Sequence, residues 1–109
     1  MIVDSFVGVE DWAIATVDAN GTLAFGRGVV SVVKAGTGVY DITLERPLPE
    51  LACSISVLSR GATPALTAVY SVAHVSDTVK VIHAFSVDSS GGGLVQDTAF
   101  HINIRRVAG

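Results

Sequence analysis

The sequence is poor in cysteine, aromatic residues and charge. Its single cysteine, Cys53, cannot form a disulfide within the chain, so the fold does not depend on an oxidising compartment. Only 6% of the residues are aromatic and 16% are charged, whereas 50% are hydrophobic. No apolar run approaches the roughly 18 residues of a membrane-spanning helix, because small or polar residues interrupt every valine-rich stretch. Membrane insertion is therefore not expected.

Basic residues are also scarce. The formal net charge is −3, and the seven Lys and Arg residues are scattered except for the pair Arg105-Arg106. Nucleic-acid binding is disfavoured, because it depends on a basic surface that neutralises phosphates. The mean hydropathy of +0.56 is high for so short a chain. This surplus of apolar residues predicts a protein interface.

The chain length of 109 residues fits one domain. Residues 1–11 are expected to form a lead-in or a short edge strand. The apolar stretch from Ile2 to Val9 is not expected to be a signal peptide, because no basic segment precedes it and Asp4 interrupts it.

Strand patterns separated by turn signals fill the rest of the chain. Tyr40, Ile42 and Leu44 alternate with polar residues, and Phe100, Ile102 and Ile104 do the same, so each set is expected to face the core. No helical periodicity persists. The predicted strands are Trp12–Val17, Thr22–Phe25, Val29–Lys34, Gly36–Leu44, Ala52–Ser59, Leu66–Val75, Thr78–Val87 and Asp97–Val107. We therefore expect an all-β fold, an antiparallel sandwich or jelly roll of about eight to ten strands.

Turn residues mark the connections between these strands. Asn20-Gly21 is a hairpin signal, because both residues tolerate positive φ. Gly26-Arg27-Gly28 allows a sharp bend, and Asp88–Gly93 is expected to be a flexible loop. The strand Leu66–Val75 has few polar residues on either face, which predicts that it is covered on both sides.

The order of these motifs resembles a known family. The matching residues are Asn20-Gly21-Thr22-Leu23, Val29–Val33, the segment Gly36–Leu44 (GTGVYDITL), Pro47-Leu48-Pro49 and Phe100–Ile104 (FHINI). This pattern is similar to the small C-terminal domains of bacteriophage tail-fibre and related virion proteins. Such domains resemble the jelly rolls of complement globular heads and of tumour necrosis factor, which assemble as homotrimers.

The resemblance implies a non-enzymatic structural and receptor-binding module located in a virion. Its partners would be two further copies of the chain and a host surface glycan or protein receptor. Tyr70, His101 and Asn103 are the residues expected at a trimer interface. Loops are the expected place for receptor contacts, and the candidate residues there are Arg60, Thr63, Asp88, Ser89 and Ser90.

Signals for chemistry are weak. His74, His83 and His101 lie on three different predicted strands and lack the spacing of a metal-ligand pair. Cys53 is in phase with apolar neighbours and is expected in the core. No catalytic residue, cofactor or metal is therefore expected.

Two alternatives remain open. A monomeric carbohydrate-binding module would use aromatic residues for sugar stacking, and Trp12 and Tyr70 are the candidates. An enzyme on a cupin-like barrel would typically show a His-x-His metal cluster, which this sequence lacks.

Overall fold

The computed structural model describes residues 9–60, 67–87 and 93–107. These residues form nine strands and one short 3-10 helix, η1 Glu50–Ala52. The strands are β1 Val9–Val17, β2 Leu23–Arg27, β3 Val29–Gly36, β4 Val39–Leu44, β5 Cys53–Arg60, β6 Thr67–His74, β7 Val79–Val87, β8 Gly93–Val95 and β9 Ala99–Val107. The predicted all-β class is confirmed.

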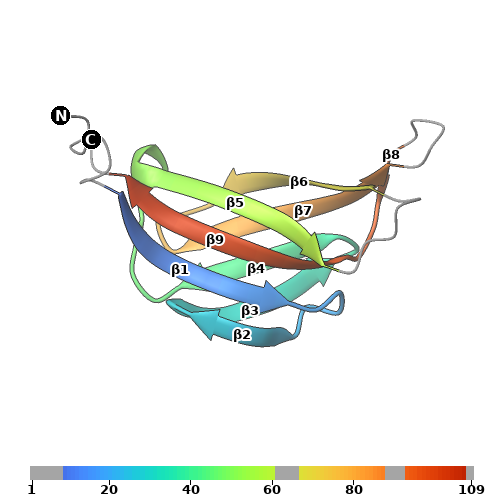
Figure 1. Ribbon diagram of the computed structural model, residues 1–109, viewed down its shortest axis with the longest axis horizontal. Helices are drawn as coiled ribbons and strands as arrows, with labels where there is room; N and C mark the ends of the chain where they lie inside the picture. The colour runs from blue at the N-terminus through green and yellow to red at the C-terminus, as the bar shows by residue number, and fades with distance from the viewer. Residues whose placement is uncertain (1–8, 61–66, 88–92, 108–109) are drawn as a thin grey trace.

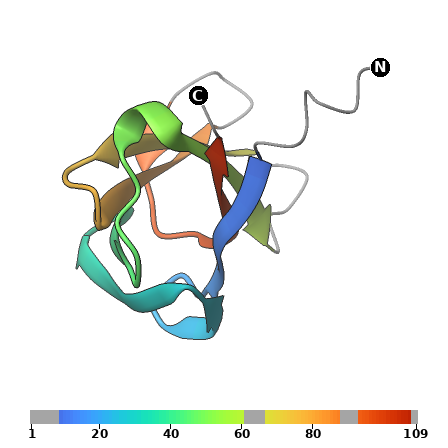
Figure 2. The same cartoon turned by 90° about the vertical axis from the view of Figure 1, so that its left-hand side faces the viewer.

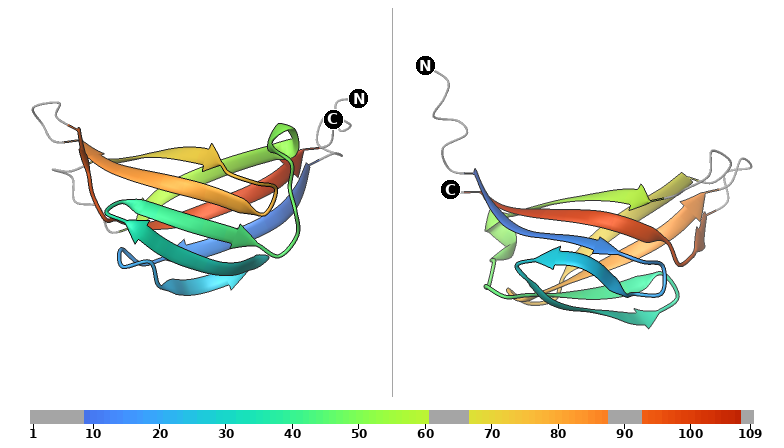
Figure 3. Two further views of the ribbon diagram at one scale, coloured as in Figure 1. Left: turned by 180° about the vertical axis from the view of Figure 1, so that it is seen from behind. Right: turned by 60° about the horizontal axis from the view of Figure 1, so that its bottom comes forward.

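Two antiparallel sheets pack face to face as a sandwich (Figures 1 and 2). Sheet A has the strand order β2-β1-β9-β5, and sheet B has the order β3-β4-β7-β6, with β8 paired to β7. Figure 3 shows sheet B in front when the molecule is seen from behind. The last strand, β9, lies between β1 and β5, so segments from the two ends and the middle of the chain share one sheet.

The turn glycines act where the sequence predicts. β1 and β2 form the hairpin expected at Asn20-Gly21. The chain then passes from sheet A to sheet B at Gly28, which has a φ of +77°. A Cβ at Gly28 would also collide with the carbonyl oxygen of Trp12. Glycine is therefore required at this corner by both conformation and space.

Three local expectations need correction. Helix η1 and strand β8 were not predicted, and Gly93, placed in a loop by its composition, begins β8. The rest of that loop, residues 88–92, lies outside the described residues. The expectation that β6 is covered on both sides is wrong for the single chain: β6 is the outer strand of sheet B, and Val69 and Val72 are 47% and 40% exposed.

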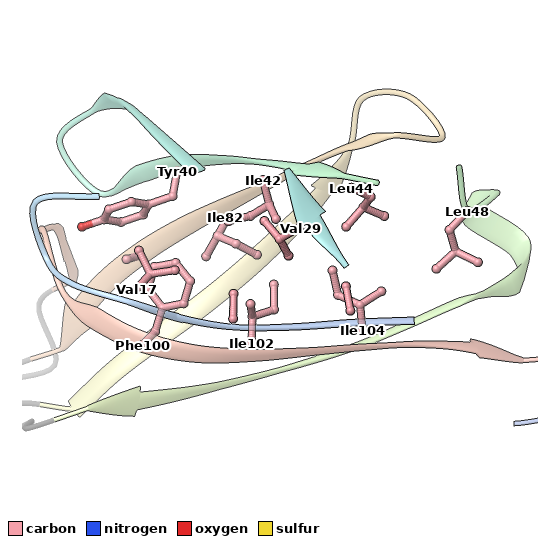
Figure 4. Close-up of a cluster of buried hydrophobic side chains, with 13 residues drawn as sticks. Val17, Val29, Tyr40, Ile42, Leu44, Leu48, Ile82, Phe100, Ile102 and Ile104 are labelled. Atoms are coloured by element: carbon pink, nitrogen blue, oxygen red, sulfur yellow. The ribbon is translucent and has the colours of Figure 1, made fainter. Parts of the chain in front are cut away.

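The core lies between the two sheets (Figure 4). It consists mainly of the residues that point inward at alternate positions along the strands. Phe100 of sheet A and Tyr40 of sheet B meet edge to face, with ring centroids 5.0 Å apart. The buried members are Ala13, Ala15, Val17, Val29, Tyr40, Ile42, Leu44, Leu48, Ile82, Ala84, Phe100, Ile102 and Ile104. The inward phase predicted for the Tyr40 and Phe100 strands is confirmed.

The hydroxyl group of buried Tyr40 is fully bonded. It donates to the carbonyl oxygen of Ala19 at 2.6 Å and accepts from the Thr98 N–H at 3.2 Å. Burial raises the pKa of this phenol. Since a buried hydroxyl is costly when unpaired, these two bonds fix the β1–β2 hairpin and the segment before β9 against β4.

Asp97 makes a second link to β4. Its Oδ1 accepts from the Gly38 N–H at 2.7 Å, and its Oδ2 lies 2.7 Å from the Lys34 ammonium. Hydrogen bonds from Lys34 and from Gly38 hold the pKa of the Asp97 carboxyl below its usual value. The turn between β3 and β4 is thereby joined to the start of β9.

Replacing Phe100 by Ala should destabilise the fold by about 3–5 kcal/mol, because it leaves a cavity between Tyr40 and Tyr70 at a fully buried site. Urea unfolding measures this loss. Leu51→Ala is the control, since Leu51 is 99% exposed and its truncation should change the free energy of unfolding little. Equal effects of the two substitutions would contradict the packing described.

Replacing Asp97 by Asn should lower the melting temperature at pH 7. An aspartate with a depressed pKa stabilises the fold above its unfolded pKa of about 3.9, and the stabilisation disappears as pH falls through the folded value. The difference between wild type and Asp97→Asn should therefore shrink below about pH 4. A difference that stays constant from pH 7 to pH 3 would show that ionised Asp97 does not stabilise the fold.

Candidate functional site

The outward surface of sheet A carries a shallow groove of about 420 Å³. Sheet A lies in front in Figure 1. Because Phe100, Ile102 and Ile104 point inward, the intervening His101 and Asn103 of β9 point outward. We call this surface the sheet A face; its side chains at the groove are Ile14, Thr16, Phe25, Ser56, Leu58, His101 and Asn103.

Strand register assembles the face in two rows. In the first row, Thr16 pairs with both Phe25 and His101, and His101 pairs with Leu58. In the second row, Asn103 lies between Ile14 and Ser56. Phe25 and Leu58 come from the outer strands β2 and β5 and are 52% and 68% exposed. They form apolar walls on either side of a floor made by β1 and β9.

Three polar side chains, those of Thr16, His101 and Asn103, lie on the floor of the groove. The Nδ1 of His101 is 2.9 Å from the Thr16 hydroxyl, so these two groups share a hydrogen bond. The Oδ1 of Asn103 is excluded from water and accepts no hydrogen bond from the described residues. An unsatisfied buried acceptor costs about 1–3 kcal/mol. A change of surroundings that supplies a donor to Asn103 would recover this energy.

Ion pairs flank the groove. Asp18 and Arg60 lie 2.9 Å apart beyond its first row, and Asp11 and Arg105 lie 3.2 Å apart beyond its second row. Arg27 is exposed at the margin on β2, opposite Ile14. None of the described residues that line the groove is an Asp, Glu, Lys or Arg. The face thus has an uncharged centre and a charged margin, the distribution typical of protein interfaces.

The structure brings together only part of the residues predicted for function. His101 and Asn103 lie side by side on the sheet A face, and Arg60 is at its margin. Tyr70 is elsewhere: on β6 it packs against Phe100 with ring centroids 5.8 Å apart, and its hydroxyl is 2.9 Å from that of Thr98. The predicted loop residues Thr63, Asp88, Ser89 and Ser90 lie outside the described residues.

Phe25 and Leu58 are functional candidates that the sequence interpretation missed. Both were placed in or at the end of predicted strands, with nothing to indicate that they share a surface. The sequence offers only the scarcity of phenylalanine, of which Phe25 is one of four; the exposure of both side chains is known from the structure. Their proximity to His101 follows from strand order.

Trp12, a candidate for sugar stacking, has one ring face covered. The guanidinium of Arg46 lies 3.7 Å from the ring centroid, which is a cation–π contact. The indole N–H donates to the carbonyl oxygen of Arg46 at 3.1 Å. Arg46 therefore takes up one face of the Trp12 ring and the indole hydrogen-bond donor that a sugar could use.

A second hollow, of about 390 Å³, lies where β5 and β6 border the sandwich, and it contains a buried lysine. Lys80 is 1% exposed, and its ammonium donates to Leu48 O at 2.7 Å, His74 Nδ1 at 2.7 Å and Ser76 O at 3.2 Å. Burial lowers the pKa of Lys80. All three ammonium protons are engaged within the protein. Lys80 therefore joins the segment that precedes η1, through Leu48, and the β6–β7 turn, through Ser76, to the core.

The sequence contained a signal for this lysine. Lys80 is in phase with Ile82 and Ala84, which are both fully buried. A lysine on the inward face of a strand is buried only when its ammonium finds acceptors, and here distant segments supply them.

Other chemical features near this hollow are limited. Burial raises the pKa of the Cys53 thiol, which keeps it protonated at neutral pH and disfavours its use as a nucleophile. No group of three or more His, Cys, Asp or Glu side chains suited to a metal occurs within residues 9–60, 67–87 and 93–107. In the same part of the chain no helix is long and apolar enough to cross a membrane.

Comparisons of the chain with protein-family models, with curated proteins and with solved structures give no match.

Replacing Lys80 by Met should destabilise the protein by about 1–3 kcal/mol, because the carbonyl groups of Leu48 and Ser76 lose their donor. Chemical denaturation measures the change. Lys34→Met is the matched control: Lys34 makes a partly exposed ion pair, whose loss should cost less than about 1 kcal/mol. If Lys80→Met is as stable as wild type, the three hydrogen bonds do not stabilise the fold.

Proposed function

We propose that this chain is a non-enzymatic structural and attachment module of a phage-type tail fibre or virion protein, and that it acts as a homotrimer. The observation that carries the proposal is the sheet A face, an uncharged groove with exposed apolar walls and an unsatisfied acceptor in its floor. The attachment role and the location in a virion rest on the family resemblance of the sequence motifs.

Self-association is supported by the shape and polarity of the sheet A face. Leu58 projects from the same surface that holds the groove, so each copy offers both an apolar projection and a hollow. Exposed apolar side chains around the groove suit burial against further copies of the chain, and the three-fold arrangement rests on the family resemblance. Burial of Phe25 and Leu58 would also account for part of the apolar surplus in the composition.

A jelly roll is the finer topology that we propose for the sandwich. Strand β9 returns to lie beside β1, and β5 pairs with its other edge. In sheet B, β7 lies between β4 and β6 in the same manner. Strands that return from a distance to pair beside an early strand are the mark of Greek-key connections, of which jelly rolls contain two.

The proposal includes no catalysis, and two side chains that could take part in a reaction, Lys80 and Cys53, lie in surroundings that disfavour it. The Lys80 ammonium has no proton left for a substrate, and the raised pKa of Cys53 disfavours a thiolate. The alternative function, a monomeric carbohydrate-binding module, is weakened by the cover of Arg46 over Trp12.

Light scattering on a sizing column should give a mass near three times that of the 11.2 kDa chain. Leu58→Asp should shift the protein toward monomer, because it would bury an unpaired carboxylate in the groove. Leu51→Asp is the control, since Leu51 is even more exposed but lies on η1, away from the sheet A face. A wild-type monomer at micromolar concentration, or a trimer unaffected by Leu58→Asp, would contradict the proposal.

A further inference from the structure

We propose that the free edge of β6 binds an extended segment of another polypeptide by strand addition. The segment is uncharged and β-branched along most of its length and has a lysine or arginine at its N-terminal end. This surface is separate from the sheet A face, so the inference does not depend on the proposed trimer.

The edge formed by β6 lacks the features that usually protect the side of a sheet. β6 is the outer strand of sheet B, and among the described strands it pairs only with β7. This pairing has no register shift, and Thr67–His74 contains no Asp, Glu, Lys, Arg or Pro. Sheets commonly protect an edge with charges, proline or a bulge. At the other edge of sheet B, β3 carries Lys34 and two register shifts. β6 is therefore the edge suited to accept a strand.

Backbone hydrogen bonds show which groups of β6 face the free edge. The Val75 N–H donates to the carbonyl oxygen of Val79 at 3.1 Å, so the backbone of Val75 faces β7. In an antiparallel pair the hydrogen-bonding direction alternates from residue to residue. Ala73 therefore also faces β7, whereas the N–H and C=O groups of Val72 and His74 point away from it. An added strand would bond to these outward groups.

The hollow of about 390 Å³ lies beside this edge. β5 and β6 both run along the upper side of the sandwich in Figure 1, and Cys53 and Ile55 of β5 line the hollow together with Val72. Val72 is 40% exposed. A residue directly opposite Val72 on an added strand would have its side chain on the same face of the sheet. The hollow would thus receive apolar side chains from alternate positions of the segment, the arrangement that gives strand addition its specificity.

Acidic side chains favour one direction and one kind of partner. Glu50 is exposed at the hollow, and Asp77, 57% exposed, follows β6 at 3.6 Å from His74. These two carboxylates outnumber the buried Lys80 ammonium. They lie at the end of β6 where an antiparallel segment would begin, so a basic residue there would complement them. A second copy of β6 offers no lysine or arginine within Thr67–His74, which assigns the partner to another polypeptide.

The probe is the acetylated and amidated peptide Lys-Thr-Val-Thr-Val-Thr-Val-Thr, added to isotope-labelled protein. Amide hydrogen exchange followed by NMR should show that the N–H groups of Tyr70, Val72 and His74 become protected, because each gains an acceptor on the peptide. Glutamate in place of the peptide lysine should weaken binding by about two- to fivefold at low salt. No binding at millimolar peptide, or protection confined to other strands, would overturn the inference and leave the proposed trimer standing.

N-methylated peptides distinguish strand addition from general apolar binding. Only alternate N–H groups of the peptide face β6, and they belong to the valines if the valine side chains enter the hollow. Methylation of the valine nitrogens should weaken binding by about tenfold or more, the equivalent of about one hydrogen bond. Methylation of the threonine nitrogens should change it little. Equal effects of the two methylations would rule out the proposed pairing.

Val72→Pro tests the same contact from the side of the protein. It removes an N–H from the free edge without removing a bond to β7, a position where proline is tolerated, and should weaken binding by about tenfold. Val72→Thr is the matched control: it keeps the N–H and should bind within about threefold of wild type. Circular dichroism establishes that both variants are folded.

Two results with the protein would contradict the inference. One is a folded Val72→Pro variant that binds the peptide as tightly as wild type. The other is protection of the β6 amides that grows with protein concentration in the absence of peptide, because a second copy would then occupy the edge.

Discussion

The contact between Tyr40 and Phe100 across the two sheets is the constraint on which the rest of the structure depends. Each ring lies on the inward side of a central strand, and the two meet at a centroid distance of 5.0 Å. Side chains alternate along a strand, so a slip of one residue would turn either ring to the outside. By holding Phe100 inward, this packing also sets His101 and Asn103 outward. The candidate interface is thus a consequence of the core.

Polar groups at the margin of the core contrast with those on the sheet A face. The Tyr40 hydroxyl, the Asp97 carboxylate and the Lys80 ammonium each bind groups from distant segments. They join the connecting segments to the sheets, and their hydrogen bonds are satisfied inside one chain. The Asn103 oxygen is not satisfied by any described residue. Among the described residues, this unmet polar requirement lies in the groove of the sheet A face, which directs attention to that surface.

Part of this candidate site could be predicted from the sequence. Alternation around Phe100 and Ile102 places His101 and Asn103 on the opposite face from the core. Phe25 and Leu58 could not be assigned to the same surface, because they are 33 positions apart in sequence and share a surface only through the pairing of β2, β1, β9 and β5. The position of Tyr70 could not be predicted either. Its strand is apolar on both faces, so the sequence pattern does not tell which face points inward, and the structure packs Tyr70 against Phe100.

The sequence by itself determined the all-β class, the positions of most strands and turns, and the inward phase of the strands that contain Tyr40 and Phe100. Those features depend on local chemistry: side-chain alternation, β-branched residues and glycines that adopt positive φ. Only the tertiary structure decided the order of the strands, the burial of Lys80 and the groove beside His101. Backbone hydrogen bonds between strands are the same for every side chain, so strand order is settled by how the whole set of inward faces packs together.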